Sequence, residues 1–198
     1  CSHPDEDHCG GLSAVLASTR TDAFYCSVDS WHTKVFSDVT KYVAEQGISV
    51  TIPQAGDTFA FSDASVEFLG PVVDYGDDPN EGSLVARVRY GETSFLFTGD
   101  MGFEAEDDML SANVDVSATV LKVAHHGSAG SSSSEFLEAV NPQYAVISVG
   151  ADNDYGHPTE ATLNRLSALH IPVYRTDLLG ELSLIHISEP TRQEAISY

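Results

Sequence analysis

The sequence has little positive charge, few cysteines and no long apolar run. Lysine and arginine together number 9, against 30 acidic residues in a chain of 198. The cysteines, Cys1, Cys9 and Cys26, form no Cys-x-x-Cys pair. This argues against a disulfide scaffold and against a cysteine-rich zinc knuckle. No apolar stretch approaches the roughly 20 residues that span a bilayer. The length suits one domain, and 42% hydrophobic residues suffice for a sizeable core.

The net charge is strongly negative, at -21 with a pI near 4.3. An acidic protein repels nucleic acid and anionic membranes at low salt. At about 1 M salt the Debye length falls to roughly 3 Å, so this repulsion is mostly screened. Many aspartates and few lysines are typical of a halophilic protein, and an ordinary acidic mesophilic protein is the alternative. The charge therefore gives no support for a nucleic-acid substrate, but it does not exclude one.

Helix and strand patterns alternate along the chain. Apolar residues at helical spacing, such as Val35, Val39 and Val43, predict a helix that Gly47 ends. Strict alternation predicts a strand over 83–90, with Arg87 on the face opposite to the apolar side chains. Helices are expected over 12–16, 33–46, 103–111, 134–140 and 158–169. Strands are expected over 22–28, 48–52, 58–61, 65–69, 83–90, 93–98, 120–124, 144–149 and 171–175.

Residues 182–198 stand apart from this pattern. The string LSLIHISEPTR, followed shortly by ISY, resembles a translated sequencing adapter. We therefore expect the domain to occupy residues 1–181 and residues 182–198 to be a non-native tail. A genuine strand over Leu182–Ile187 is the alternative. The segment, including His186, carries no functional argument.

Four potential metal ligands crowd the first motif, SHPDEDHCGGL. If the chain leaves a strand here, His3, Asp5 and Asp7 point to one side, and the turn at Gly10–Gly11 brings His8 round to join them. Such crowding is unfavourable through like-charge repulsion and desolvation, and a divalent cation offsets it. A polar surface loop is the alternative reading.

Three more polar clusters follow predicted strands. Asp100 ends the strand in LFTGDM, the pair His125–His126 follows the strand in LKVAHHGS, and His157 precedes Pro158. The alternatives are an N-cap role for Asp100 and a loop role for His157. Adjacent residues of an extended chain point apart, so one histidine of the pair should ligate and the other orient substrate or hydrogen-bond nearby. Together these clusters predict a groove at one end of a sheet.

The motif order HxDxDHxGG, GD, HHGS and GHP resembles the metallo-β-lactamase superfamily, and more narrowly its ComEC-type competence hydrolase branch. The resemblance covers residues 2 to about 181. It implies an α/β (α+β) fold, an αββα sandwich with a two-metal groove between its halves. The β-hairpin that family members carry ahead of the first motif is missing here. We therefore expect a fragment that is truncated at both ends.

The resemblance also implies a ligand set. His3, Asp7 and His8 match the first motif, and Asp5 stands where many members have histidine. Asp100 matches the bridging carboxylate. His157 matches the late histidine. His126, Ser128 and Asn80 are expected to contact the metal ligands or the substrate.

The superfamily's middle histidine is absent, because the stretch before the GD motif reads Asn80-Glu81-Gly82-Ser83. We infer that His125 fills this gap, with Asn80 the weaker candidate. With Asp5 in place of an imidazole, the first site is harder, which shifts the preference from Zn²⁺ toward Mn²⁺ or Mg²⁺.

These assignments predict a hydrolase with two divalent metal ions, zinc or manganese, with magnesium a further candidate. A metal-activated hydroxide would attack the substrate, and Asp7 would ligate one metal and orient or accept the proton. The competence-type resemblance favours a phosphodiesterase or nuclease acting on DNA. The alternatives are hydrolysis of a lactone, thioester or β-lactam, and a metal-binding module without turnover.

The expected partner is a nucleic acid or a small phosphodiester, and no membrane contact is expected from this fragment itself. A competence-type parent would place the domain outside the cytoplasmic membrane, and a secreted protein is equally compatible. Neither the oligomeric state nor the presence of upstream membrane segments follows from the sequence.

The charge generates one testable expectation. Because the net charge of -21 is self-repelling at low ionic strength, the melting temperature should rise between about 0.1 M and 2 M KCl as screening takes hold. Differential scanning calorimetry over this range measures the effect. A melting temperature that is highest in dilute buffer would contradict the halophilic interpretation.

Overall fold

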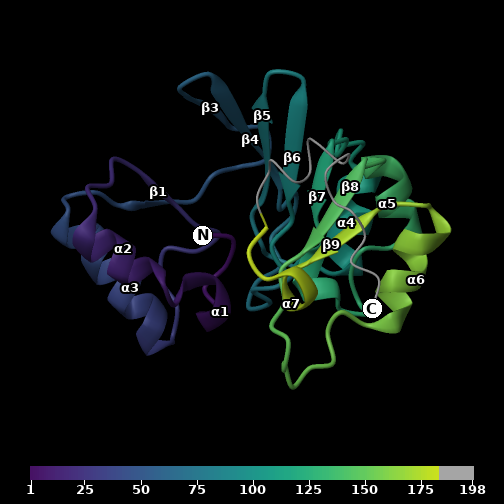
Figure 1. Ribbon diagram of the computed structural model, residues 1–198. Coiled ribbons are helices and arrows are strands. Elements are labelled where there is room, and N and C mark those ends of the chain that lie inside the picture. The colour runs from purple at the N-terminus through teal and green to yellow at the C-terminus, as the bar shows by residue number, and fades with distance from the viewer. Residues whose placement is uncertain (183–198) are drawn as a thin grey trace.

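The computed structural model describes residues 1–182. The alternative strand over 182–187 and His186 lie outside the described residues, apart from Leu182 itself. The chain begins with a small helical unit, at the left of Figure 1. In it, α2 (Leu12–Ser18) and α3 (Lys34–Glu45) pack on a two-stranded parallel sheet of β1 (Phe24–Tyr25) and β2 (Val50–Thr51). Its core contains Phe36, Val39 and Val43 of α3.

The second layer of strands is a seven-stranded sheet in which the strands follow chain order. The first four strands pair antiparallel and the last four pair parallel, so the fourth strand belongs to both groups. The strands are β3 (Thr58–Phe61), β4 (Ala64–Gly70), β5 (Val85–Tyr90), β6 (Thr93–Phe97), β7 (Val120–Lys122), β8 (Tyr144–Ile147) and β9 (Val173–Arg175).

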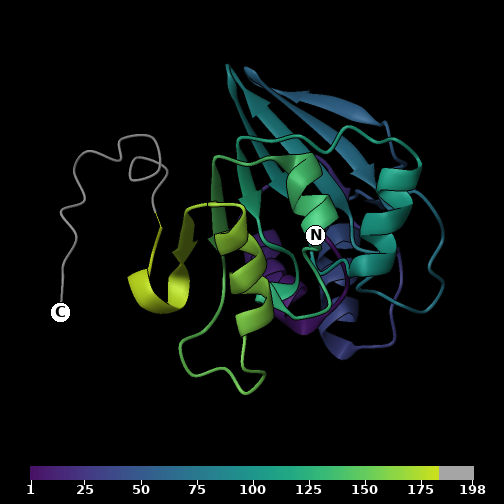
Figure 2. The same cartoon turned by 90° about the vertical axis from the view of Figure 1, so that its right-hand side faces the viewer.

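Three helices cover the face of this sheet that is turned away from the small unit, and Figure 2 views the molecule from their side. They are α4 (Phe103–Ser111), α5 (Ser134–Val140) and α6 (Glu160–Ala168). Their buried residues Met109, Phe136 and Leu166 share one core with Leu96 and Leu121 of the sheet. The layers therefore run helices, small sheet, large sheet, helices, which confirms the expected α/β sandwich of αββα type.

The two sheets meet through aromatic side chains. The ring of Tyr25 on β1 stacks on Phe59 of β3, with centroids 5.1 Å apart, and lies 5.4 Å from the ring of Phe68 on β4. Within the described residues, the first strand begins at Phe24. No helix of the described residues has the length and apolarity that a membrane crossing requires.

Several sequence expectations need correction. The strands expected over 22–28 and 48–52 shrink to two residues each, and two one-turn helices were not expected, α1 (Glu6–Cys9) and α7 (Thr176–Leu179). Arg87 does lie on the face opposite to Ala86 and Val88, but this face is the buried one, which Arg87 shares with Val85. Its guanidinium lies 2.7 Å from Glu67 and 3.1 Å from Asp115, which neutralise its charge.

The parallel half of the sheet determines where the polar motifs lie. The strands β6, β7 and β8 all point the same way, so the segments that follow them emerge at one edge of the sheet. These segments carry Asp100, the His125–His126 pair, and the loop that leads to His157.

Candidate metal site

Asp100 stands at the centre of the site, one tight turn beyond β6. Gly99 makes this turn with a φ of +55°, and a Cβ there would lie 2.6 Å from the Cβ of Ser83. Glycine is therefore required by both conformation and space. The Asp100 backbone N–H donates a hydrogen bond to Ser83 Oγ at 3.0 Å, and the Asp100 side chain is only 5% exposed. The turn thus fixes a buried carboxylate at the sheet edge.

The first motif is helical rather than extended at its end, which corrects the strand geometry expected for it. The one-turn helix α1 contains both Asp7 and His8. His8 Nε2 lies 3.1 Å from Asp100 Oδ1, and its Nδ1 lies 3.2 Å from Ser2 Oγ. Helix α1 therefore brings His8 to the other ligands, a role that was expected for the turn at Gly10–Gly11.

The His125–His126 pair also departs from the expected geometry. The strand β7 ends at Lys122, and both histidines lie in a 3₁₀ segment, η1 (Ala124–Gly127), with φ values of 47° and 53°. Alternation along an extended chain does not hold for such a left-handed turn. Both Nε2 atoms consequently approach Asp100 Oδ2, that of His126 at 3.5 Å and that of His125 at 3.8 Å.

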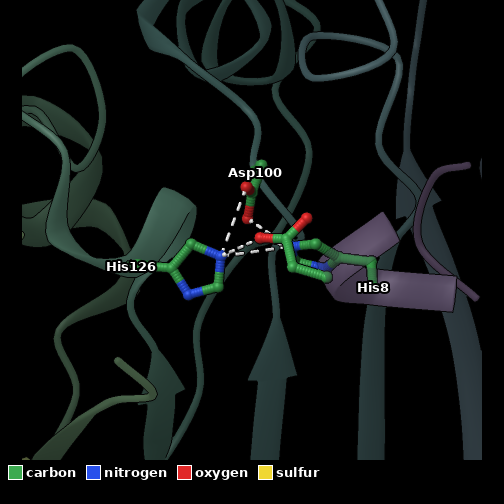
Figure 3. Close-up of side chains that lie close together, drawn as sticks. His8, Asp100 and His126 are labelled. Carbon is green, nitrogen blue, oxygen red and sulfur yellow. Dashed lines mark hydrogen bonds and ion pairs between the residues drawn. The ribbon is translucent and has the colours of Figure 1, made fainter. Parts of the chain in front are cut away.

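Asp7, His8, Asp100 and His126 form a tetrad. Each offers one ligand atom, and these atoms all lie within 4.8 Å of one another. His126 Nε2 is 3.1 Å from both Asp7 Oδ2 and His8 Nε2. Figure 3 shows His8 and His126 approaching Asp100 from opposite sides. The structure thus brings His126, rather than His125, into the tetrad.

A ring hydrogen bond orients His126. Its Nδ1 lies 2.6 Å from the carbonyl oxygen of Ser148. Because that oxygen only accepts, the proton resides on Nδ1 and the Nε2 lone pair is left for a ligand role.

His3 and Asp5 adjoin the tetrad. The His3 ring is buried, with its centroid 4.1 Å from that of His8, and Asp5 Oδ2 lies 3.8 Å from His3 Nε2. His3 Nδ1 contacts two hydroxyls, Ser2 Oγ at 3.1 Å and Ser83 Oγ at 3.2 Å. These contacts turn Nε2 away from the serines, toward Asp5.

His157 lies beside His125, with ring centroids 5.7 Å apart. The two motifs interlock, because a Cβ on Gly127, whose φ is +86°, would lie 2.6 Å from Pro158 Cβ. Thr159 also donates its backbone N–H to the Gly127 carbonyl oxygen at 2.9 Å. Gly127 is thus the second position of the site that requires glycine, and it allows the GHP motif to pack directly against the HHGS motif.

The structure does not bring Ser128 and Asn80 into the tetrad. Ser128 Oγ accepts from Gly130 N at 3.3 Å, and its carbonyl oxygen accepts from Thr162 Oγ1 at 2.6 Å, so the residue shapes its own loop. Asn80 lies in the turn before β5, where its carbonyl oxygen accepts from Ser83 N at 3.0 Å.

Sequence reasoning missed the residues that position the motifs. Ser83 holds both His3 and Asp100, and nothing in its spacing distinguishes it from other serines. Glu106 of α4 is fully buried and accepts from the backbone N–H groups of Ser132 and Ser133. Arg165 of α6 donates to the carbonyl oxygen of Ser132 at 2.8 Å. These two long-range contacts hold the loop that follows the histidine pair.

Electrostatics favour the metal-binding protonation states of His3 and Asp100. Burial lowers the pKa of His3 to about 4, so this imidazole is neutral near pH 7. Burial acts to raise the pKa of Asp100, but hydrogen bonds from His126 and His8 outweigh it and hold the pKa well below its usual range. The bond to Asp100 in turn raises the pKa of His126 against the effect of burial, so a cation at His126 Nε2 would have to displace a proton there. The site therefore offers a fixed carboxylate anion surrounded by imidazoles.

The residues present fit divalent cations. One buried ring atom of these ligands, His3 Nε2, has no hydrogen-bond partner within the part of the chain that the structure describes. A buried polar atom without a partner is unfavourable by about 1–3 kcal/mol, and ligation would remove that penalty. Imidazole nitrogen and carboxylate oxygen are the donors that Zn²⁺ and Mn²⁺ take in proteins.

Comparison with known proteins identifies the family of the chain. Residues 1–151 match the family described as the metallo-beta-lactamase superfamily. The chain is 30% identical to ComE operon protein 3 of Bacillus subtilis and 36% identical to competence protein ComA of Neisseria gonorrhoeae. Each match covers 91% of this chain, but only 23% and 24% of the relative. The chain thus spans about a quarter of the curated relatives it matches.

One solved structure supports the fold. The crystal structure of CmlA, a diiron beta-hydroxylase from Streptomyces venezuelae, superposes with a TM-score of 0.58 at 16% identity. The match covers 88% of this chain and 42% of that one.

Recombination protein 2 of Haemophilus influenzae is a third sequence relative, 31% identical over 91% of this chain and 21% of its own length.

The tetrad makes a discriminating prediction about the histidine pair. His126→Ala removes a member of the tetrad, so the affinity for one Mn²⁺ should fall by more than the roughly 10- to 100-fold that loss of an outer partner costs. His125→Ala should reduce that affinity less, because its Nε2 lies farther from Asp100. Calorimetric titration of Mn²⁺ measures both, with the exposed His32→Ala as control. Loss of binding in His125→Ala alone would restore the assignment made from the sequence.

Proposed function

Because the chain belongs to the metallo-beta-lactamase superfamily, we propose that it is a dinuclear metal-dependent phosphodiesterase that acts on DNA. The observation that carries the proposal is the tetrad around the buried Asp100, with His3 and Asp5 beside it. A carboxylate has two oxygens, and those of Asp100 face different histidines, Oδ1 toward His8 and Oδ2 toward His126.

We assign the two cations of the proposal to two groups of these residues. Asp7, His8, Asp100 and His126 would hold one cation. His3 and Asp5 would hold the other, with Asp100 shared between the two. The first position has two imidazoles and the second has one, which favours Mn²⁺ or Zn²⁺, with Mg²⁺ the harder alternative.

Cations bound there would lower the pKa of a bound water toward neutrality and stabilise negative charge that develops on phosphate oxygens. The chain's own residues supply the rest. The Asp7 side chain is 62% exposed and lies 3.1 Å from His126, so its free oxygen can orient the attacking water and accept its proton. His125 is partly exposed beside Asp100, where it can donate a hydrogen bond to the leaving oxygen.

The DNA substrate rests on two supports. Two of the relatives are named as a competence protein and a recombination protein, and we take these names to favour a DNA substrate. A phosphodiester is also a suitable substrate for a site whose positive charge comes from bound cations, because the phosphate is an anion. The groove beside the tetrad has no lysine or arginine among its lining residues, so the metals alone would offset the charge of the phosphate.

Substrate profiling with Mn²⁺ tests the proposal. The protein should cleave a single-stranded oligonucleotide and should leave a β-lactam, a lactone and a thioester intact. Asp100→Asn, purified in parallel, should lose more than about 100-fold in rate, exceeding the usual loss for an outer partner. Asp38→Asn, an exposed change on α3, is the matched control. Turnover of an acyl substrate instead of DNA would overturn the proposal, and metal binding without any turnover would indicate a binding module.

A further inference from the structure

A groove of about 260 Å³ adjoins the tetrad. Asp7 and His126 line it, together with Asn153, Tyr155 and His157 from the loop between β8 and α6. A substrate whose scissile phosphate lies at Asp7 and His126 would therefore extend over this loop. Nothing in the proposed chemistry uses Asn153 or Tyr155.

Tyr155 is the most exposed large hydrophobic side chain within residues 1–182, at 82%. A single exposed aromatic residue needs no explanation by itself. Tyr155 differs because its neighbour orients it: its ring lies nearly parallel to that of His157, at 22°, with centroids 5.9 Å apart. One part of the ring thus faces a motif residue, while most of its surface remains open to the groove and solvent.

One side chain holds the loop in this shape. Asn153 Nδ2 donates to the carbonyl oxygens of Gly150, at 2.9 Å, and His157, at 2.7 Å. Its Oδ1 accepts from the backbone N–H of His157 at 2.9 Å. These three hydrogen bonds tie both ends of the loop together, so that Tyr155 is presented without the ordering penalty of a free loop.

We propose that Tyr155 is a stacking platform for an unpaired base of single-stranded nucleic acid, next to the phosphodiester held at the tetrad. This inference rests on the proposed function. Every base has a π face, and stacking on an aromatic side chain contributes about 1–3 kcal/mol per base. Bases in a duplex are already stacked on each other and gain nothing from the platform.

The charge of the protein supports stacking over electrostatic binding. A basic groove would track the phosphate backbone and lose affinity steeply with salt. Here the lining has no basic side chain, and the net charge is -21. Stacking is not weakened by salt in this way, so it suits binding by a strongly acidic protein.

The test compares two single strands that differ only in their bases. One is an oligothymidylate, and the other carries abasic sites around the scissile linkage. Tyr155→Ala should lower kcat/KM for the intact strand by about 5- to 150-fold, mainly through KM, as the stacking energy implies. The preference for the intact over the abasic strand should disappear with it. Tyr155→Phe should retain this preference, because the ring remains.

Tyr90→Ala is the matched control, since Tyr90 is 63% exposed and lies on β5, outside the groove. Equal losses on the intact and abasic strands in Tyr155→Ala would overturn the platform, as would equal activity on duplex and single strand in the wild type. Fluorescence anisotropy of the same strands separates the two proposals. Without turnover in the wild type, the phosphodiesterase proposal fails, and the platform stands or falls on whether Tyr155→Ala weakens the Kd for the intact strand alone.

Discussion

The buried carboxylate of Asp100 is the constraint on which the rest of the site depends. An isolated anion in this position is unfavourable by several kcal/mol, and the groups that approach its oxygens are imidazoles rather than lysine or arginine. Imidazoles stabilise the anion only in part, because most of their positive character depends on protonation. A divalent cation satisfies the carboxylate and the imidazole lone pairs together. The crowding of donors around Asp100 is therefore explained by a metal site, and it is poorly explained by a network that only stabilises the fold.

The fold meets this demand by converging three loops and a one-turn helix on one sheet edge. Two glycines with positive φ permit the close approach: Gly99 beside Ser83, and Gly127 against Pro158. Contacts outside the motifs then hold the loops. Glu106 of α4 and Arg165 of α6 form hydrogen bonds with the backbone of the segment that follows the histidine pair. The site is thus a property of the packed sandwich rather than of any single motif.

Local pattern predicted most of the fold but only part of the site. The helices at 103–111 and 134–140 and the strand at 58–61 appear with the expected bounds, because apolar periodicity and burial agree there. The choice between His125 and His126 could not follow from alternation, since both residues adopt left-handed backbone that strand geometry does not describe. Ser83 could not be found either, because its role comes from contacts with residues 80 positions earlier and 17 later. The convergence of the motifs on one sheet edge did follow from the pattern, because each polar cluster was expected just after a strand.

The most direct test of the account is anomalous diffraction from crystals of the protein grown with Mn²⁺. We expect two anomalous peaks that share Asp100, one bounded by Asp7, His8 and His126 and the other beside His3 and Asp5. Data collected on both sides of the manganese edge would distinguish these peaks from lighter ions. Two empty positions at saturating Mn²⁺, or a metal bound only at residues outside this set, would contradict the central claim.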